Sequence, residues 1–114
     1  VVNLDQVPPA ALLPSETCIE VDLADPLATR EVLAEVVARH APTRLVNKAG
    51  IVRPGPLEDV TIEDLDAVVS LNLRCAIQCA QALLPGMKAS CFGRIVRIAT
   101  WVMQRPCCSP VFCT

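Results

Sequence analysis

Tyrosine is missing altogether from this chain of 114 residues, and the other aromatic residues are few, with two Phe and one Trp. These residues therefore contain no phenol that could transfer protons. Positive charge is also sparse: the formal net charge is −2, and Lys and Arg are scattered without a basic run, which disfavours a nucleic-acid surface. No apolar run reaches the roughly 18 residues of a membrane helix, and the first residues lack the features of a signal peptide. We therefore expect no nucleic-acid partner, no membrane contact and a cytoplasmic location.

The chain does contain enough apolar sequence for one domain with a core. Hydrophobic residues make up 53% and charged residues 19% of the sequence, which is typical of a globular domain. Residues 1–114 are therefore interpreted as a single domain. Its last part, 101–114, shows neither a helical nor a strand period and is expected to form an irregular, cysteine-rich tail.

Seven cysteines divide into two groups by their surroundings. Four lie in apolar segments, where a reduced Cys packs as a small hydrophobe: Cys18, Cys75, Cys79 and Cys91. The tail holds Cys107, Cys108 and Cys113, whose spacing matches no common zinc site and which have no His nearby. We expect no metal site, with metal binding or oxidative pairing of the three tail cysteines as the alternative.

Strands and helices alternate along the sequence. Apolar, β-rich runs predict strands at 1–5, 17–23, 43–47 and 93–99, with a proline-rich loop at 6–16. This alternation predicts an α/β fold in which a parallel sheet is covered by helices on both faces, giving three layers. Ligands of such sheets bind at the carboxyl ends of the strands, where the polar and very small residues of this chain gather.

Local chemistry predicts the helix boundaries. Asp25 followed by Pro26 indicates the start of a helix that runs to about residue 40. Thr61 with Asp64 resembles a capping box and opens a long amphipathic helix at 61–84, which Pro85 and the glycine after it end or kink.

Four sequence features in this order resemble the short-chain dehydrogenases/reductases, which are nicotinamide-dependent oxidoreductases with a Rossmann-type fold. They are "VDL" after the second strand, "NKAG" at 47–50, an Asn within the long helix, and "GRIVRIAT" at 93–100. The resemblance covers residues 1–100. It implies a small carbonyl or alcohol substrate and hydride transfer to or from a nicotinamide.

The resemblance also assigns cofactor-binding roles. It implies that Asn47 helps to fix the central strands and that the backbone of Ala49 and Gly50 lies along the cofactor, while Lys48 replaces a second Asn of the usual motif. An ordinary strand-to-turn transition is the alternative explanation for these small residues.

Two further strand ends match the adenosine side of such a site. Asp5 stands where members that prefer NAD keep an acid that binds the ribose hydroxyls and repels a 2′-phosphate, so NAD is expected rather than NADP. Asp22 and Leu23 match the pair that lines the adenine pocket. Asp is also common in turns at strand ends, which is the alternative reading.

Asn72 and Thr100 match the positions of two catalytic groups. The family places an Asn at a helix kink, where it holds a water of the proton-relay chain, and Thr100 falls where the catalytic Ser is expected. For Asn72, the alternative is an amide on the wetter side of the helix.

Other parts of the family pattern are not present in the sequence. The family uses a Tyr with a Lys four residues later, and a Gly-rich loop about 20 residues before the acid that matches Asp5. The first strand of the fold would likewise precede Val1. We therefore expect an incomplete Rossmann-like domain, lacking the first strand and the C-terminal part, whose half-sheets either pair directly or leave the central slot open.

The functional expectation has two forms. The first is a fragment of an NAD(P)-dependent short-chain oxidoreductase that is inactive as written. The second is a non-catalytic interaction module that docks through helix 61–84, a helix which the family uses to form homo-oligomers.

Overall fold

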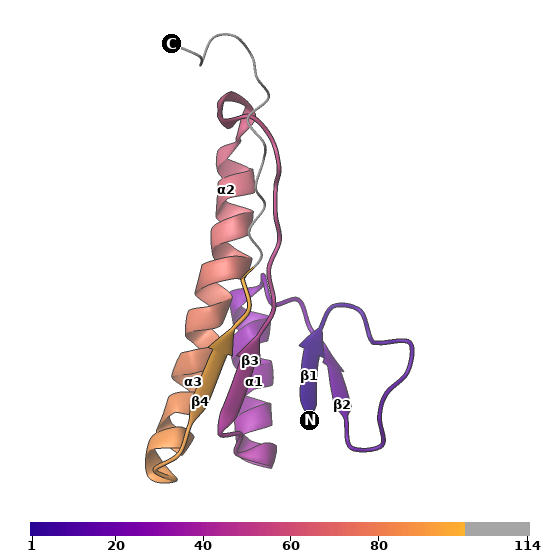
Figure 1. Ribbon diagram of the computed structural model, residues 1–114, viewed down its shortest axis with the longest axis vertical. Helices are drawn as coiled ribbons and strands as arrows, with labels where there is room; N and C mark the ends of the chain where they lie inside the picture. Colours follow the sequence, from indigo (N-terminus) through magenta and orange to yellow (C-terminus); the bar gives the residue numbers. More distant parts are fainter. Residues whose placement is uncertain (100–114) are drawn as a thin grey trace.

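The computed structural model of the chain describes residues 1–99. Four strands are present in this range: β1 (Val2–Asp5), β2 (Thr17–Glu20), β3 (Arg44–Asn47) and β4 (Arg94–Arg97). The helices are α1 (Pro26–His40), a single 3-10 turn η1 (Leu57–Asp59), α2 (Ile62–Val69) and α3 (Cys75–Ala89). A π-helical turn, η2 (Ser70–Arg74), joins α2 to α3, so that the three form one long rod (Figure 1). All four predicted strands and both long helices are therefore present.

The strands form two separate parallel pairs within residues 1–99. β1 pairs with β2, with Leu4 opposite Ile19, and β3 pairs with β4, with Val46 opposite Val96. The two pairs are not hydrogen-bonded to each other, and Figure 1 shows them standing apart. Of the two expected arrangements, the open slot is the one observed. The parallel strands with their helices confirm the α/β class of the fold.

The two long helices share one core. Buried residues of α1 meet buried residues of α3, and alternate strand residues such as Leu4, Ile19 and Leu45 pack on the same cluster. The core residues are Leu23, Val32, Leu33, Val36, Cys75, Cys79, Leu83 and Met87. Because successive strand residues point to opposite faces, the other face turns outward, and Val46 is 62% exposed there. Within residues 1–99 the helices thus cover one face of the strands, whereas the sequence predicted cover on both.

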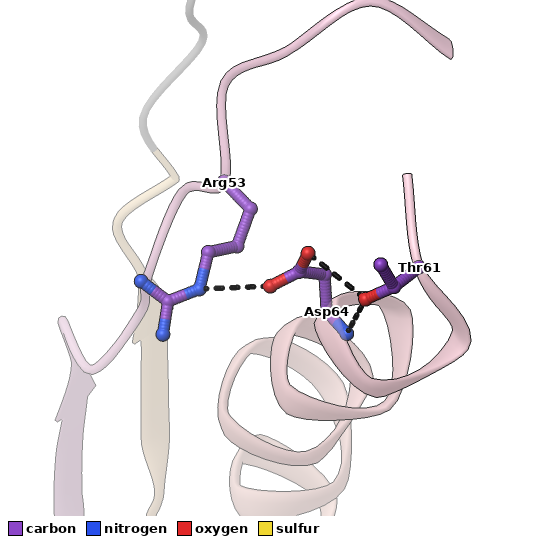
Figure 2. A network of polar contacts seen from close by, with 3 residues as sticks. All are labelled: Arg53, Thr61 and Asp64. Carbon is purple, nitrogen blue, oxygen red and sulfur yellow. Dashed lines mark hydrogen bonds and ion pairs between the residues drawn. The ribbon is translucent and has the colours of Figure 1, made fainter. Parts of the chain in front are cut away.

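Side-chain hydrogen bonds cap the N-termini of α1 and α2. Asp25 accepts hydrogen bonds from the backbone N–H groups of Leu27 (2.8 Å) and Ala28 (3.3 Å), with Pro26 at the first helical position. Figure 2 shows the corresponding cap of α2, in which Thr61 Oγ1 accepts from the Asp64 N–H at 3.1 Å and donates to Asp64 Oδ2 at 3.0 Å. Both helix starts agree with the sequence prediction.

The end of the long helix differs from the prediction. α3 continues through Pro85 to Ala89, so of the two expectations at Pro85, a helix end or a kink, the helix end is wrong. A proline inside a helix loses its own N–H bond and its ring crowds the carbonyl four residues earlier, but continuing the helix buries Met87, which is 6% exposed. Ser90 then closes the helix, because its N–H and its hydroxyl both donate to the Gly86 carbonyl at 3.0 Å.

The rod Ile62–Ala89 is also long and apolar enough to cross a membrane when judged by length and composition alone. The prediction of no membrane helix rested on the lack of an uninterrupted apolar run. This helix nevertheless meets the length and composition criterion because its polar residues are spread along its length. The core helix of a globular domain passes the same test. One such helix is weak evidence for a membrane span, but only 17% of its apolar window is buried in the described residues, so packing on α1 does not by itself account for its composition.

Candidate functional site

Asn72 holds the segment that follows β3. Its Oδ1 accepts a hydrogen bond from the Ile51 N–H at 2.8 Å, and its Nδ2 donates to the Ile51 carbonyl at 2.9 Å. One amide side chain thus satisfies both polar groups of the same residue, in the manner of a sheet ladder. Together with the ion pair between Arg53 and Asp64 further along the same segment, this pair of bonds fixes the path of the chain as it leaves β3.

The π turn places Asn72 opposite this segment. In η2 the Cys75 N–H bonds to the Ser70 carbonyl, five residues earlier, which inserts an extra residue into the helix. Such turns occur frequently at functional sites. The sequence pointed to Asn72 as an amide at a helix kink, and the structure places it in the middle of this irregular turn.

Gly50 leaves room for the Asn72 side chain. A Cβ at Gly50 would lie 3.2 Å from Asn72 Oδ1 and 3.7 Å from its Cγ. The backbone φ of Gly50 is not positive, so the reason for a glycine here is space and not conformation. The sequence reading assigned this space to a cofactor; in the structure, an amide of the chain itself already lies against it.

Asn47 is buried at the end of β3, with 8% of its surface exposed. Its carbonyl accepts from the Ile98 N–H at 2.8 Å, which extends the pairing of β3 with β4. Within residues 1–99 its Nδ2 has no hydrogen-bond partner. A buried amide donor without a partner costs about 1–3 kcal/mol, so this position fits the role of a group that bonds to a neighbour across the open slot.

The ends of β1 and β2 form a polar edge. Asp22 Oδ1 accepts from the Gln6 Nε2 at 2.6 Å and from the Ala24 N–H at 2.9 Å, while the Asp5 carboxylate accepts the Val7 N–H at 3.3 Å. Asp5 and Asp22 thus lie at the carboxyl ends of neighbouring strands, as predicted.

An open hollow of about 470 Å³ lies along this edge, lined by Gln6, Glu20, Val21 and Asp22. Its lining contains two acids and no Lys or Arg, so its electrostatic potential disfavours an anion. Leu23, which was expected to line an adenine pocket together with Asp22, is 9% exposed and belongs to the core cluster.

Thr100, predicted as the second catalytic group, lies outside the described residues, as do Cys107, Cys108 and Cys113. Within residues 1–99, no three His, Cys, Asp or Glu side chains are grouped so that they could hold a metal ion.

The structure adds one residue that the sequence reading did not select. The guanidinium of Arg97, at the end of β4, donates to the main-chain carbonyl of Asn72. Arg97 was part of the quoted "GRIVRIAT" motif, and its only sequence signal is a charge inside a strand that was expected to be buried. A contact between residues 25 positions apart in the sequence cannot be read from that signal alone.

Two cysteines of α3 also come together. The sulfur atoms of Cys75 and Cys79 are 3.9 Å apart in the core. The hydrogen bond with Cys75, together with burial, raises the pKa of the Cys79 thiol. The same hydrogen bond lowers the pKa of the Cys75 thiol, but both side chains are buried in the core cluster, where they pack as expected from their apolar segments.

Comparison with known proteins places these features in one family. The chain is 41% identical over 56 residues to a D-beta-hydroxybutyrate dehydrogenase of Cupriavidus necator, covering 49% of this chain and 22% of the relative. It is 36% identical over 93 residues to an L-xylulose reductase of Mesocricetus auratus, covering 81% of this chain and 37% of the relative. The chain thus spans well under half the length of these relatives.

A solved structure shares the arrangement of the strands and helices. A metagenomic short-chain oxidoreductase in complex with NADP matches with a TM-score of 0.70 and 28% identity, covering 80% of this chain and 42% of that protein. This similarity supports a Rossmann-type fold for this chain. Residues 10–109 match the family model described as short chain dehydrogenase, and the chain therefore belongs to the short-chain dehydrogenase family.

Proposed function

We propose that this chain forms the nucleotide-facing edge of an NAD(P)-dependent oxidoreductase that acts on a small carbonyl or alcohol substrate. The observation that carries the proposal is the pair of hydrogen bonds by which Asn72 holds Ile51 next to Gly50, at the carboxyl end of β3. Parallel α/β sheets bind ligands at this edge. The polar ends of β1 and β2 lie at the same edge of the fold.

The residues present suit the adenosine half of the coenzyme. Asp5 is exposed at the end of β1 and has carboxylate lone pairs available for ribose hydroxyls. Asp22 and Gln6 provide further polar groups beside the hollow. Because the edge carries acids and its hollow has no cation, a 2′-phosphate is repelled, and we propose NAD as the preferred coenzyme over NADP.

Titration calorimetry with NADH and with NADPH tests this preference. We expect the chain to bind NADH roughly three-fold more tightly than NADPH, the size of effect that one exposed charge produces. Asp5→Asn should bring the two affinities together, whereas Asp59→Asn, which removes an exposed acid of η1 and leaves the ends of β1 and β2 unchanged, should not. Tighter binding of NADPH by the unmodified chain, or an Asp5→Asn variant that keeps the original preference for NADH, would overturn the assignment.

The bound coenzyme would supply or accept the hydride, and the chain's own residues would position it. In this proposal the amide of Asn72 keeps the backbone of Ala49 and Gly50 in place, and the hydroxyl of Thr100 donates to the substrate oxygen. The 114 residues contain no Tyr to transfer the accompanying proton. We therefore propose that the purified chain of 114 residues has no dehydrogenase turnover. Measurable turnover that Asn72→Ala abolishes would contradict this.

A second candidate function rests on the outer face of the rod. Six apolar residues of α2, η2 and α3 are each at least 38% exposed: Ile62, Leu65, Val69, Leu73, Ile77 and Leu84. We propose that this stripe docks on a second copy of the chain or on a related subunit. Association of the chain without coenzyme binding would favour this docking function. A cytoplasmic location stays a prediction for both candidate functions.

Light scattering coupled to size-exclusion chromatography separates the two readings. We expect a concentration-dependent dimer that Leu73→Glu converts to a monomer, with Asp66→Lys on the same helix as a control for charge. A monomer at all concentrations would leave only the coenzyme reading. Binding of the stripe to lipid vesicles, in place of a second copy, would point to a membrane surface and contradict the proposed dimer.

A further inference from the structure

We propose that Arg97 is a positioning residue that sets the Asn72 amide against Ile51. Arg97 is the last residue of β4, and its guanidinium donates to the main-chain carbonyl of Asn72. The side chain of the same Asn72 makes both of its hydrogen bonds to Ile51. The three residues thus form one chain of contacts from β4, through the π turn, to the segment after β3.

The π turn makes this contact consequential. Its backbone bond runs from the Cys75 N–H to the Ser70 carbonyl, so the turn is wider than that of an α-helix. A carbonyl oxygen has two lone pairs and accepts a donor from outside the helix. A charged donor makes a stronger hydrogen bond than a neutral one, and Arg97 therefore holds the turn in the orientation that aims Asn72 at Ile51.

The strand pairing fixes Arg97 in turn. Arg97 lies opposite Asn47 in the register of β3 and β4, and the next residue, Ile98, donates its N–H to the Asn47 carbonyl at 2.8 Å. The backbone that carries the Arg97 side chain is therefore hydrogen-bonded to the end of β3, just before the segment that Asn72 holds. Displacement of the π turn would therefore disturb several connected contacts: Arg97 with Asn72, Asn72 with Ile51, and β4 with β3.

Within residues 1–99, no acidic side chain forms an ion pair with Arg97 that would compete with its hydrogen bond to Asn72. The structure describes two ion pairs in residues 1–99, Arg39 with Glu35 and Arg53 with Asp64, and neither involves Arg97. Its described side-chain hydrogen bond goes to the Asn72 carbonyl. The role of Arg97 in the reaction rests on the proposed function, but its role in positioning Asn72 does not.

Hydrogen exchange of the Ile51 amide measures that positioning directly, because this N–H is donated to Asn72 Oδ1. In Arg97→Met we expect Ile51 to exchange roughly ten-fold faster, the change expected for a lost charge-assisted bond, while the amides of α1 keep their rates. Arg97→Lys should restore part of the protection, because Lys keeps the charge with fewer donors. Arg94→Met, on the same strand, should leave Ile51 unchanged.

A double-mutant cycle distinguishes positioning from simple support of the fold. If Arg97 acts through the Asn72 side chain, Arg97→Met should have no further effect on Ile51 exchange in the Asn72→Ala background. Unchanged Ile51 exchange in Arg97→Met, or an equal rise in the α1 amides, would overturn the proposal. If Arg97→Met does not fold, the partial effect expected for Arg97→Lys carries the same test. Coenzyme affinity is not needed for either readout, so its failure would affect only the proposed function.

Discussion

The helix layer and the strand layer of this chain differ in how completely they are buried. The contact between α1 and α3 contains nearly all of the core, with Leu33 and Leu83 at 3% and 4% exposure. By contrast, every residue of β4 is exposed, and Val46 of β3 turns outward. Stability therefore resides in the helix pair, whereas the strand ends carry the polar groups of the candidate site.

The largest expected effect tests where the stability lies. Leu83→Ala should lower the free energy of unfolding by about 3 kcal/mol, because it leaves a cavity in the helix contact. Leu84→Ala, the neighbouring residue at 38% exposure, should cost less than about 1 kcal/mol. Urea unfolding followed by circular dichroism gives both values. Equal losses would show that the helix contact is not the main core.

Thiol labelling sharpens the same comparison. Cys75 and Cys79 are buried in α3, and the pKa of Cys79 is raised by its bond with Cys75 and by burial, whereas Cys91 is exposed. Because the thiolate is the form that reacts, raising the pH from 8 to 9 should not increase the labelling rate of Cys79. We expect iodoacetamide to label Cys91 at least about 100-fold faster than this pair in the folded chain.

Tryptic digestion separates the two sites by mass, since Cys75 and Cys79 fall in peptide 75–88 and Cys91 falls in peptide 89–94. Urea should remove the difference between the peptides. Comparable labelling of both peptides without urea would mean that the helix contact opens readily.

Two glycines test the packing at the strand ends. Gly50→Ala should cost about 1–2 kcal/mol, because its Cβ would press on Asn72 at 3.2 Å. Gly55→Ala meets nothing within 4 Å and should be neutral or slightly stabilising. Thermal unfolding of the two variants measures the difference. If Gly50→Ala is as stable as Gly55→Ala, Asn72 does not lie against Gly50.

The smallest effect is expected at the start of α2. Arg53→Met removes an exposed ion pair with Asp64 at 3.5 Å and should change the free energy of unfolding by less than about 0.5 kcal/mol. Thr61→Ala removes the cap shown in Figure 2 and should cost about 1 kcal/mol. A larger loss for Arg53→Met than for Thr61→Ala would mean that Arg53 contributes more to stability than its exposed ion pair explains.

Features that depend on neighbouring residues in the sequence were predicted well. Asp25 and Thr61 cap the helices that they were expected to start, since capping needs only the next three residues. The gathering of Asp5, Asp22 and Asn47 at strand ends also follows from the alternation of strands and helices. The resemblance to a known family, together with the strand order, predicted that the half-sheets would either pair directly or leave the central slot open, but it did not choose between the two.

Features set by contacts distant in the sequence were not predicted. The helix continues past Pro85 because burial of Met87 favours it, and the resemblance indicated a helix kink at Asn72 without predicting its π-helical hydrogen bonding. The burial of Leu23 in the core cluster depends on contacts with α1 and α3 and was not predicted, while its assignment to an adenine pocket stays a prediction. The contact of Arg97 with Asn72 likewise requires β4 and the rod to be placed first.

Hydrogen exchange of the whole chain, with and without NADH, tests the division between a stabilising helix layer and a ligand-binding strand edge most directly. The account predicts the slowest exchange in α1 and α3 under both conditions. On addition of NADH, it predicts slower exchange confined to residues that follow β1, β2 and β3, including Gln6, Ala24 and Ile51. Protection that appears along the exposed stripe of the rod, with no change at these strand ends, would contradict it.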